Sequence, residues 1–328
     1  MLIENMPLRR PGIPAISAII AMIAVVALSA SYVFIRPSDT PVTSVAVIAP
    51  TVTATSLPIR AIPIYQIPPQ LQSASAYFYD PNVSDGFSFG FKADEQRPMA
   101  STTKIMTAVV ALLIATNYAT PITVTSDVLQ IDKQASVMGC RPGETLTLTE
   151  LLYGLLLPSG DDAAVAIADG LAGSQANFVT KMNDTAAWLH LTNTHFVNVH
   201  GLDADGHYSS ARDLAHLAEF AMSIPLFRQI VGTDTETIAR TSQHGTFKLT
   251  NTNEFLDAST QAGKLNATLG IDGIKTGFTG NAEYCFVVHA RRNGHEVYGV
   301  ILGEQVLYDR FIDSAAMLTW AYTQIPGA

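Results

Sequence analysis

The sequence predicts a mixed α/β fold of the α+β type, in which an antiparallel sheet is flanked by helices. Two groups of strand-like segments, residues 75–91 and 273–303, enclose a helical middle. In the second group, Asn293-Gly294 stands between two apolar runs, which is a strong signal for a β-hairpin. The N-terminal strands must pair with the C-terminal ones to form a sheet, so the middle becomes a helical subdomain and a functional site is expected where the two meet.

The predicted helices begin at recognisable polar residues. Residues 98–114 start as a loop with Ser and Thr, which are good N-cap residues, and continue as an apolar, buried helix. Residues 151–157 predict a second apolar helix, followed by a turn and a new helix near Asp161. Asp161 and Asp162 are typical N-cap or first-turn acids of that helix. A last helix is expected over residues 310–320.

The C-terminal strands are predicted as a meander. Residues 273–280 read as a strand with small residues on its exposed edge, and Gly277 is expected to let a substrate backbone approach closely. Residues 284–290 and 295–302 follow as an antiparallel pair. Residues 74–328 are therefore predicted to form one catalytic domain.

The N-terminal region predicts a membrane anchor. Arg9 and Arg10 precede the apolar residues 13–35, which are 23 residues and enough to span a bilayer. We expect residues 1–36 to be a cytoplasmic tip and an uncleaved transmembrane signal anchor, and a cleaved signal peptide is the alternative. The expected location is the cell membrane, single-pass, with the catalytic domain on the extracytoplasmic side. The Pro/Thr/Ser-rich residues 37–73 are expected to form a tether with a reach on the order of 100 Å.

Composition excludes some functions. The net charge of −9 and the lack of a basic patch argue against nucleic-acid binding. The histidines lack metal-ligand spacing, and neither a metal nor another cofactor is expected. Cys140 and Cys285 form either a disulfide or two buried thiols. Trp188 and Trp320 are expected in the core.

Three short motifs occur in a fixed order: Ser101-Thr-Thr-Lys104, Ser159-Gly-Asp161 and Lys275-Thr-Gly277. Ser101 and Lys104 are three positions apart, so they lie on one face of a helix. A serine hydroxyl needs a base to become a good nucleophile, and a lysine can serve once burial or a nearby positive charge keeps it partly neutral. The motifs together predict a serine nucleophile with two lysines.

From about residue 75 to the C-terminus, the chain resembles the serine-type D-alanyl-D-alanine carboxypeptidases, the low-molecular-mass penicillin-binding proteins. The resemblance includes the three motifs and the segments 97–101, 198–203, 209–213, 251–256 and 272–279. It implies a β-lactamase/transpeptidase-like fold with the active site between the sheet and the helical subdomain.

The resemblance implies a role for each matching catalytic residue. Ser101 would be the acylated nucleophile, Lys104 its general base, and Ser159 a proton relay to the leaving amine. Asp161 departs from the family, which usually has asparagine there. An ionised aspartate cannot donate a hydrogen bond, and it could pair with Lys104 and weaken it as a base. We expect an active enzyme in which Asp161→Asn raises turnover near neutral pH.

The resemblance also implies the substrate-binding residues. Lys275 would supply positive charge and Thr276 a hydroxyl for the substrate carboxylate. The backbone N–H groups of Ser101 and Phe278 would form an oxyanion hole beside Gly277. Arg310 matches a family arginine near the carboxylate end, and a salt bridge at the start of the last helix is its alternative role.

The implied function is removal of the terminal D-alanine from peptidoglycan stem pentapeptides, with β-lactams as covalent inhibitors at Ser101. A catalytically weak, membrane-tethered penicillin- or wall-binding protein is the alternative. A β-lactamase is less favoured, because such enzymes place a glutamate between the second and third motifs in a Glu-x-x-Leu-Asn segment. Glu219, Glu236 and Glu254 occur there, and none lies in such a segment.

Overall fold

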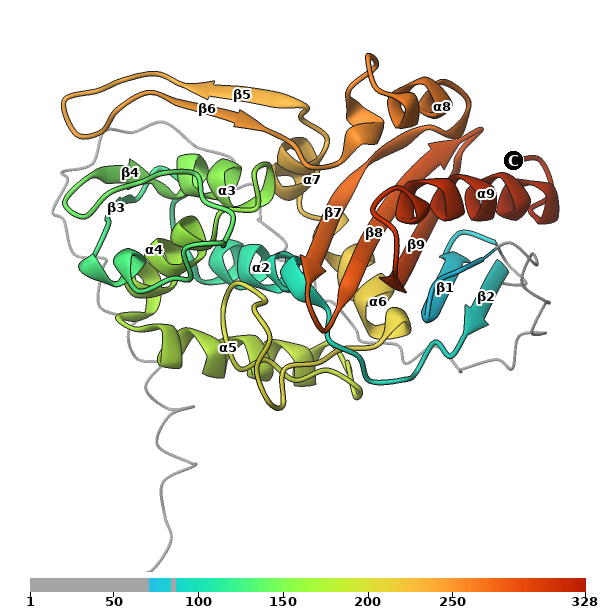
Figure 1. Cartoon of the computed structure of the whole chain (residues 1–328), viewed down its shortest axis with the longest axis horizontal. Coiled ribbons are helices and arrows are strands. Elements are labelled where there is room, and N and C mark those ends of the chain that lie inside the picture. The colour runs from blue at the N-terminus through green and yellow to red at the C-terminus, as the bar shows by residue number, and fades with distance from the viewer. Residues whose placement is uncertain (1–70, 84–86) are drawn as a thin grey trace, which may run out of the picture. The chain divides into compact units, whose positions relative to one another are not determined.

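The computed structural model describes residues 71–83 and 87–328, which build a five-stranded antiparallel sheet covered by helices (Figure 1). The sheet order is β2-β1-β9-β8-β7, and β1 pairs with β9 from Ser75↔Leu302 to Tyr79↔Tyr298. The predicted pairing of N-terminal with C-terminal strands is therefore confirmed. The strands are β1 (Ser75–Asp80), β2 (Phe87–Phe91), β7 (Ile271–Thr279), β8 (Glu283–Arg292) and β9 (His295–Glu304).

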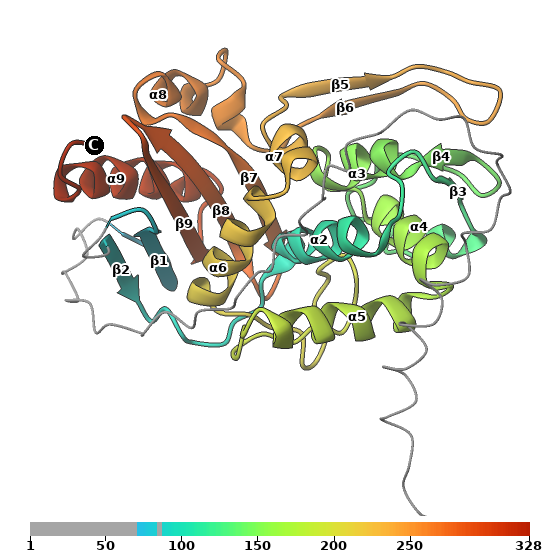
Figure 2. The ribbon, with the colours of Figure 1, turned by 180° about the vertical axis from the view of Figure 1, so that it is seen from behind.

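Alternating side chains of the strands build two cores, one on each face of the sheet. In β1, Ala76 and Phe78 join the core beneath α9 (Asp309–Gln324) and α8 (Gln261–Leu269). Tyr77 and Tyr79 join the other core, together with residues of α6 (Ala211–Met222). Figures 1 and 2 show α9 and α6 on opposite faces of the sheet. A strand buried on both faces needs apolar residues at successive positions, as these strands have.

The helical subdomain surrounds α2 (Lys104–Ile114), whose residues 104–112 are all buried. A helix that is apolar on all sides is stable only inside a protein, so α2 takes the central position. Two short two-stranded antiparallel sheets, which the sequence analysis did not predict, extend this half of the structure: β3 with β4, and β5 with β6. The remaining elements are β3 (Pro121–Thr123), β4 (Thr145–Thr147), α3 (Leu148–Leu156), α4 (Asp161–Ala172), α5 (Gln175–Trp188), α7 (Pro225–Val231), β5 (Thr235–Ile238) and β6 (Phe247–Thr250).

The turn between β8 and β9 is the predicted two-residue hairpin. Asn293 and Gly294 have φ values of +50° and +86°. Two consecutive left-handed residues are the pattern of a type I′ turn, whose twist matches that of the flanking strands. The prediction from Asn-Gly is confirmed.

Two expectations about the core need correction. Cys140 and Cys285 are both free and buried, so the disulfide alternative is wrong and the two buried thiols are present. Burial raises the pKa of both thiols. Trp320 packs against Phe87 and Phe89, as expected. Trp188 is 61% exposed, because it lies at the C-terminal end of α5 with its ring edge against Phe220 alone.

Two buried acids, Glu304 at the end of β9 and Asp313 in α9, lie near each other. Glu304 is fully buried, and Asp313 accepts a hydrogen bond from Gln72 N at 2.7 Å. Burial, with the neighbouring charge of Asp313 second, raises the pKa of Glu304 to about 8. Two adjacent carboxyl groups in a dry environment cannot both ionise easily, so they hold a proton at neutral pH.

The predicted anchor, residues 1–36, and residues 37–70 of the predicted tether lie outside the described residues. Within residues 71–83 and 87–328, no helix is both long and apolar enough to cross a membrane. All the candidate site residues lie in the described part.

Candidate active site

Ser101 and Lys104 meet where a short 3₁₀ helix, η1 (Ala100–Thr103), runs into α2. Lys104 Nζ lies 2.8 Å from Ser101 Oγ, 2.6 Å from His200 O and 2.6 Å from Asp161 Oδ1. These three acceptors match the three N–H bonds of an ammonium group, so this geometry suits the protonated lysine. After loss of one proton, the free electron pair of Nζ could accept the proton of Ser101.

Two opposing effects set the pKa of Lys104. The side chain is fully buried, and desolvation of its charged form lowers the pKa below the ordinary value. The buried carboxylate of Asp161 stabilises the ammonium and opposes this decrease. Desolvation is the larger effect, so Asp161 lowers the fraction of Lys104 in the neutral form without cancelling the influence of burial.

Ser159 and Asp161 lie in the tight connection between α3 and α4. Ser159 has a φ of +66°, is 5% exposed, and its Oγ has no hydrogen-bond partner among the described residues. Asp161 begins α4, as predicted, and points its carboxylate at Lys104. Asp162 has a different role, because its carboxylate accepts the backbone N–H groups of residues 138, 139 and 140 and fixes that loop.

The third motif lies on β7, an edge strand of the sheet. Lys275 is 1% exposed, and burial, followed by the charges of Lys104 and Arg310, holds its pKa well below the ordinary value. Thr276 shares a 2.6 Å hydrogen bond between its Oγ1 and that of Thr252. The structure thus brings the two predicted lysines close enough for the charge of Lys104 to lower the pKa of Lys275.

Close packing of β7 against η1 explains why position 277 is a glycine, in addition to the expected approach of substrate. A Cβ atom at this position would lie 3.0 Å from Ala100 Cβ and 3.1 Å from Ser101 N. Any larger residue would therefore push β7 away from η1. The next residue, Phe278, is 56% exposed, and its ring stacks on Tyr284 at 4.4 Å between centroids. Close contact of β7 with the Ser101 amide is what the predicted oxyanion hole requires.

Arg310 lies at the start of α9 and points toward β7. Its Nη1 donates to Gly277 O at 3.4 Å, and its guanidinium packs over the rings of Tyr284 and Phe311. Among the described residues it forms no ion pair with a carboxylate, so the alternative of a helix-start salt bridge is not observed there. Burial lowers the pKa of Arg310, although the group remains cationic. A role for Arg310 near the carboxylate end of the site stays a prediction, and the structure places its guanidinium beside Gly277 of the third motif.

The sequence analysis missed two members of the site, His200 and Thr252. Both lie in segments that carried the resemblance, but the atoms used are a backbone carbonyl and a hydroxyl with no distinctive pattern. His200 lies in a bend of the chain where Asn198 Oδ1 accepts from His200 N at 3.3 Å and from Gly201 N at 2.7 Å. Across residues 71–83 and 87–328, no cluster of three or more His, Cys, Asp or Glu side chains has the geometry of a metal site.

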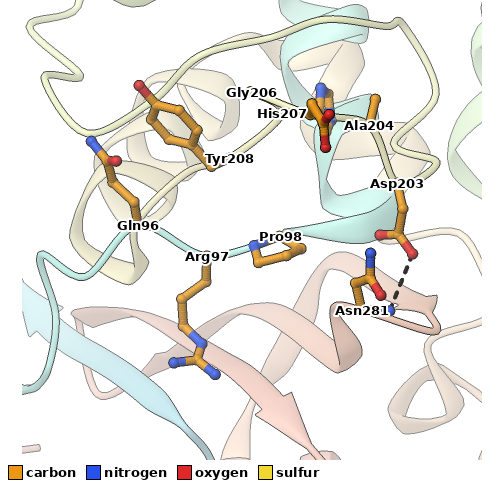
Figure 3. A pocket seen from close by; sticks show the side chains of 10 residues that line it. Gln96, Arg97, Pro98, Asp203, Ala204, Gly206, His207, Tyr208 and Asn281 are labelled. Atoms are coloured by element: carbon orange, nitrogen blue, oxygen red, sulfur yellow. Dashed lines mark hydrogen bonds between the residues drawn. The ribbon is translucent and has the colours of Figure 1, made fainter.

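An open cavity of about 410 Å³ lies between the segment that precedes the first motif, residues 96–98, and the loop of residues 203–208 (Figure 3). Its wall contains Asp203, which accepts from Thr279 Oγ1 at 2.7 Å and from Asn281 N at 3.1 Å. These two bonds hold the end of β7 against the loop after Gly201. None of the five predicted catalytic residues lines the cavity, which is bounded by Gln96, Arg97, Pro98, residues 203–208 and Asn281.

A comparison with known families and proteins adds independent evidence. A family model described as D-alanyl-D-alanine carboxypeptidase matches residues 68–306. D-alanyl-D-alanine carboxypeptidase DacF of Bacillus subtilis is 35% identical over 237 residues, covering 71% of this chain and 58% of DacF. The chain therefore spans a little over half the length of that relative. A D-alanyl-D-alanine carboxypeptidase of Streptomyces sp. strain K15 is 36% identical over 242 residues, covering 70% of this chain and 80% of the relative.

Solved structures show the same fold. The crystal structure of the Streptomyces K15 DD-transpeptidase matches with a TM-score of 0.69 and 30% identity, covering 80% of this chain and 100% of that chain. A D-alanyl-D-alanine carboxypeptidase from Mycobacterium tuberculosis H37Rv matches with a TM-score of 0.68 and 28% identity, covering 81% and 95%. The predicted α+β, transpeptidase-like fold is confirmed.

Proposed function

The chain belongs to the D-alanyl-D-alanine carboxypeptidase family, the low-molecular-mass penicillin-binding proteins, and we propose that it removes the terminal D-alanine from peptidoglycan stem pentapeptides. The contact between Lys104 Nζ and Ser101 Oγ, at 2.8 Å in a buried site, is the observation that carries this proposal. The reaction would proceed through an acyl-enzyme on Ser101.

In the acylation step, neutral Lys104 takes the proton of Ser101 while Oγ forms a bond to the carbonyl carbon of the penultimate D-alanine. The carbonyl oxygen becomes an oxyanion near the N–H groups of Ser101 and Phe278. One such donor typically contributes about 3 kcal/mol of transition-state stabilisation. Collapse of this intermediate breaks the peptide bond and releases the terminal D-alanine once its nitrogen is protonated.

Ser159 is suited to deliver that proton. Its buried Oγ has no hydrogen-bond partner among the described residues, so it is free to contact the leaving nitrogen and pass on a proton received from Lys104. Arg310, which remains cationic, and Lys275 lie at this site, whereas the carboxylate of Asp161 is paired with Lys104, which leaves positive charge in excess. This excess of positive charge favours a substrate that ends in a carboxylate, which the Thr276 hydroxyl could also contact.

Water then hydrolyses the acyl-enzyme. Each of the three glutamates between the second and third motifs accepts a hydrogen bond from a residue outside the three motifs. Glu219 accepts from Tyr79 OH, Glu254 from Tyr308 OH, and Glu236 from Thr237 N. We therefore expect β-lactams to acylate Ser101 and to be released slowly, as inhibitors rather than substrates.

The Lys104–Asp161 ion pair favours a second candidate, a penicillin-binding protein with little turnover. Release of D-alanine from a D-Ala-D-Ala-terminated peptide, measured beside fluorescent-penicillin labelling of the full chain, separates the two. Release and labelling that both vanish in Ser101→Ala support the carboxypeptidase. Labelling without release at any pH would favour the binding protein, and absence of both in folded protein would reject the proposed site.

We also propose that residues 1–36 anchor the enzyme in the cell membrane, with residues 37–73 as a tether and the catalytic domain outside the cytoplasm. The support is the pair Arg9-Arg10 before a 23-residue apolar segment, and the location of peptidoglycan. Sedimentation of the full chain with membranes, and its solubilisation by detergent but not by salt, is the expected result. Recovery in the soluble fraction would contradict the anchor.

A further inference from the structure

The residue before the nucleophile, Ala100, has a strained backbone. Its φ is +49°, a left-handed conformation that residues with a Cβ atom rarely adopt. Such a conformation persists only where the surroundings enforce it, and such residues cluster at functional sites. Since Ala100 precedes Ser101, its backbone angles decide where the Ser101 side chain begins.

Two glycines, Gly201 and Gly277, pack closely against Ala100. A Cβ at Gly201, whose φ is +101°, would lie 2.0 Å from Ala100 O, and a Cβ at Gly277 would lie 3.0 Å from Ala100 Cβ. The two backbones therefore touch the Ala100–Ser101 peptide directly. This packing limits where the peptide can move, and a hydrogen bond to the Ala100 carbonyl adds a directional contact.

A chain of three hydrogen bonds supplies that direction. Val197 N donates to His207 Nδ1 at 3.0 Å, so Nδ1 carries no proton. His207 must then hold its proton on Nε2 and donate it to Thr103 Oγ1 at 2.8 Å. The Thr103 hydroxyl, having accepted one proton, donates its own to Ala100 O at 2.8 Å. Each group thus has one allowed orientation.

We propose that His207 and Thr103 are positioning residues that hold Ala100 in its left-handed conformation and so aim Ser101 at the substrate. Neither residue needs to touch the reacting atoms. The inference deepens the proposed function and rests on it, because it assigns the machinery that prepares Ser101 for acylation.

The environment of His207 favours the series of hydrogen bonds from Val197 to Ala100. The side chain is 5% exposed and packs edge-on against Phe196, while its residue lines the cavity in Figure 3. Burial, with smaller effects from neighbouring histidines, lowers the pKa of His207 to about 4. The neutral ring that the three bonds require is therefore the form present near neutral pH.

The test measures acylation of Ser101 by a fluorescent penicillin, resolved into binding and rate, in the full chain. Thr103→Val and His207→Phe should each lower the limiting rate on the order of 10- to 100-fold with little change in binding, since small misplacements of reacting groups have effects of this size. Thr103→Ser keeps the hydroxyl and should restore most of the rate. The double variant should be no slower than the worse single variant, because either change breaks the same chain.

Tyr322→Phe is the matched control. Its buried hydroxyl also donates to a backbone carbonyl, Leu269 O at 3.0 Å, but it joins α9 to α8 away from Ser101. Tyr322→Phe should lower the unfolding midpoint and leave the acylation rate unchanged. A Thr103→Val rate within twofold of wild type, a Thr103→Ser rate as low as that of Thr103→Val, or multiplying losses in the double variant would each overturn the proposal.

A second measurement does not depend on any reaction. A crystal structure of Thr103→Val should show Ala100 outside the left-handed region or its carbonyl turned, and an unchanged Ala100 would overturn the proposal. Release of D-alanine by the wild type is scored separately, so a missing carboxypeptidase activity would contradict the proposed function without altering this structural result.

Discussion

Replacing Asp161 by asparagine removes the charge that stabilises the protonated form of Lys104. The two groups lie 2.6 Å apart and both are buried. At an effective dielectric constant near 20, such a pair attracts by about 6 kcal/mol. The amide of the asparagine would retain an oxygen that accepts from Lys104 Nζ, so only part of this energy is lost. Even a quarter of it would increase the neutral fraction of Lys104 about tenfold at a pH below its pKa.

The sign of the expected change follows from the role of Lys104. Its neutral form is the base, and Asp161 raises its pKa against the lowering by burial. Asp161→Asn therefore lowers the pKa, moves the acid limb of the pH–rate profile to lower pH, and raises D-alanine release near neutral pH. The assay compares kcat/KM for a D-Ala-D-Ala-terminated peptide across pH in the two proteins.

A matched control separates local from general charge effects. Asp169→Asn removes the same charge from the same helix, where Asp169 accepts from Thr125 Oγ1 instead of Lys104, and it should leave the acid limb in place. An unchanged limb and rate in Asp161→Asn would refute the reasoning. So would an equal shift in Asp169→Asn, because the effect would then not come from contact with Lys104.

Two further predictions concern buried groups without full partners. Ser159→Ala should lower the rate of acyl-enzyme formation about 10²- to 10⁴-fold, as loss of a proton-transfer group typically does. The urea midpoint of unfolding should stay unchanged, because Ser159 Oγ has no hydrogen-bond partner to lose among the described residues. A large loss of stability would show a structural role instead. Because the pKa of Glu304 is raised to about 8 by burial, the folded state binds its proton more tightly than the unfolded state. The free energy of unfolding should therefore fall as pH rises from the ordinary carboxyl range to about 8, by about 1.4 kcal/mol per pH unit at most. Glu304→Gln should flatten this slope, and a slope that persists would assign it to other groups.

Local patterns in the sequence predicted most of the sheet and the three motifs. Asn293-Gly294 specified its turn because two left-handed residues are needed there, and the apolar run after Lys104 specified a buried helix. The two-stranded sheets β3/β4 and β5/β6 were missed because their strands have only three or four residues. Such short strands show too little alternation to be distinguished from loops.

The parts of the site that could not be predicted depend on tertiary contacts. Whether Asp161 faces Lys104 depends on how α4 packs beside α2, and sequence spacing contains no such information. The His200 carbonyl is invisible to any motif, since every residue has one. Trp188 was misplaced for the opposite reason: a large apolar side chain usually packs inside, but the end of α5 leaves it in solvent.

The pairing of β1 with β9 affects how this chain acquires its structure during synthesis. β1 is made first among the sheet strands, and β9, its partner on the side away from β2, follows more than 200 residues later. Contacts between such distant segments slow folding, because a long loop must close before they form. Until β9 emerges from the ribosome, β1 and β2 have no sheet to join, and β7 has only a growing hairpin beside it. A stop codon that removes β9 would thus leave all three motifs in the polypeptide and still prevent the sheet from being completed.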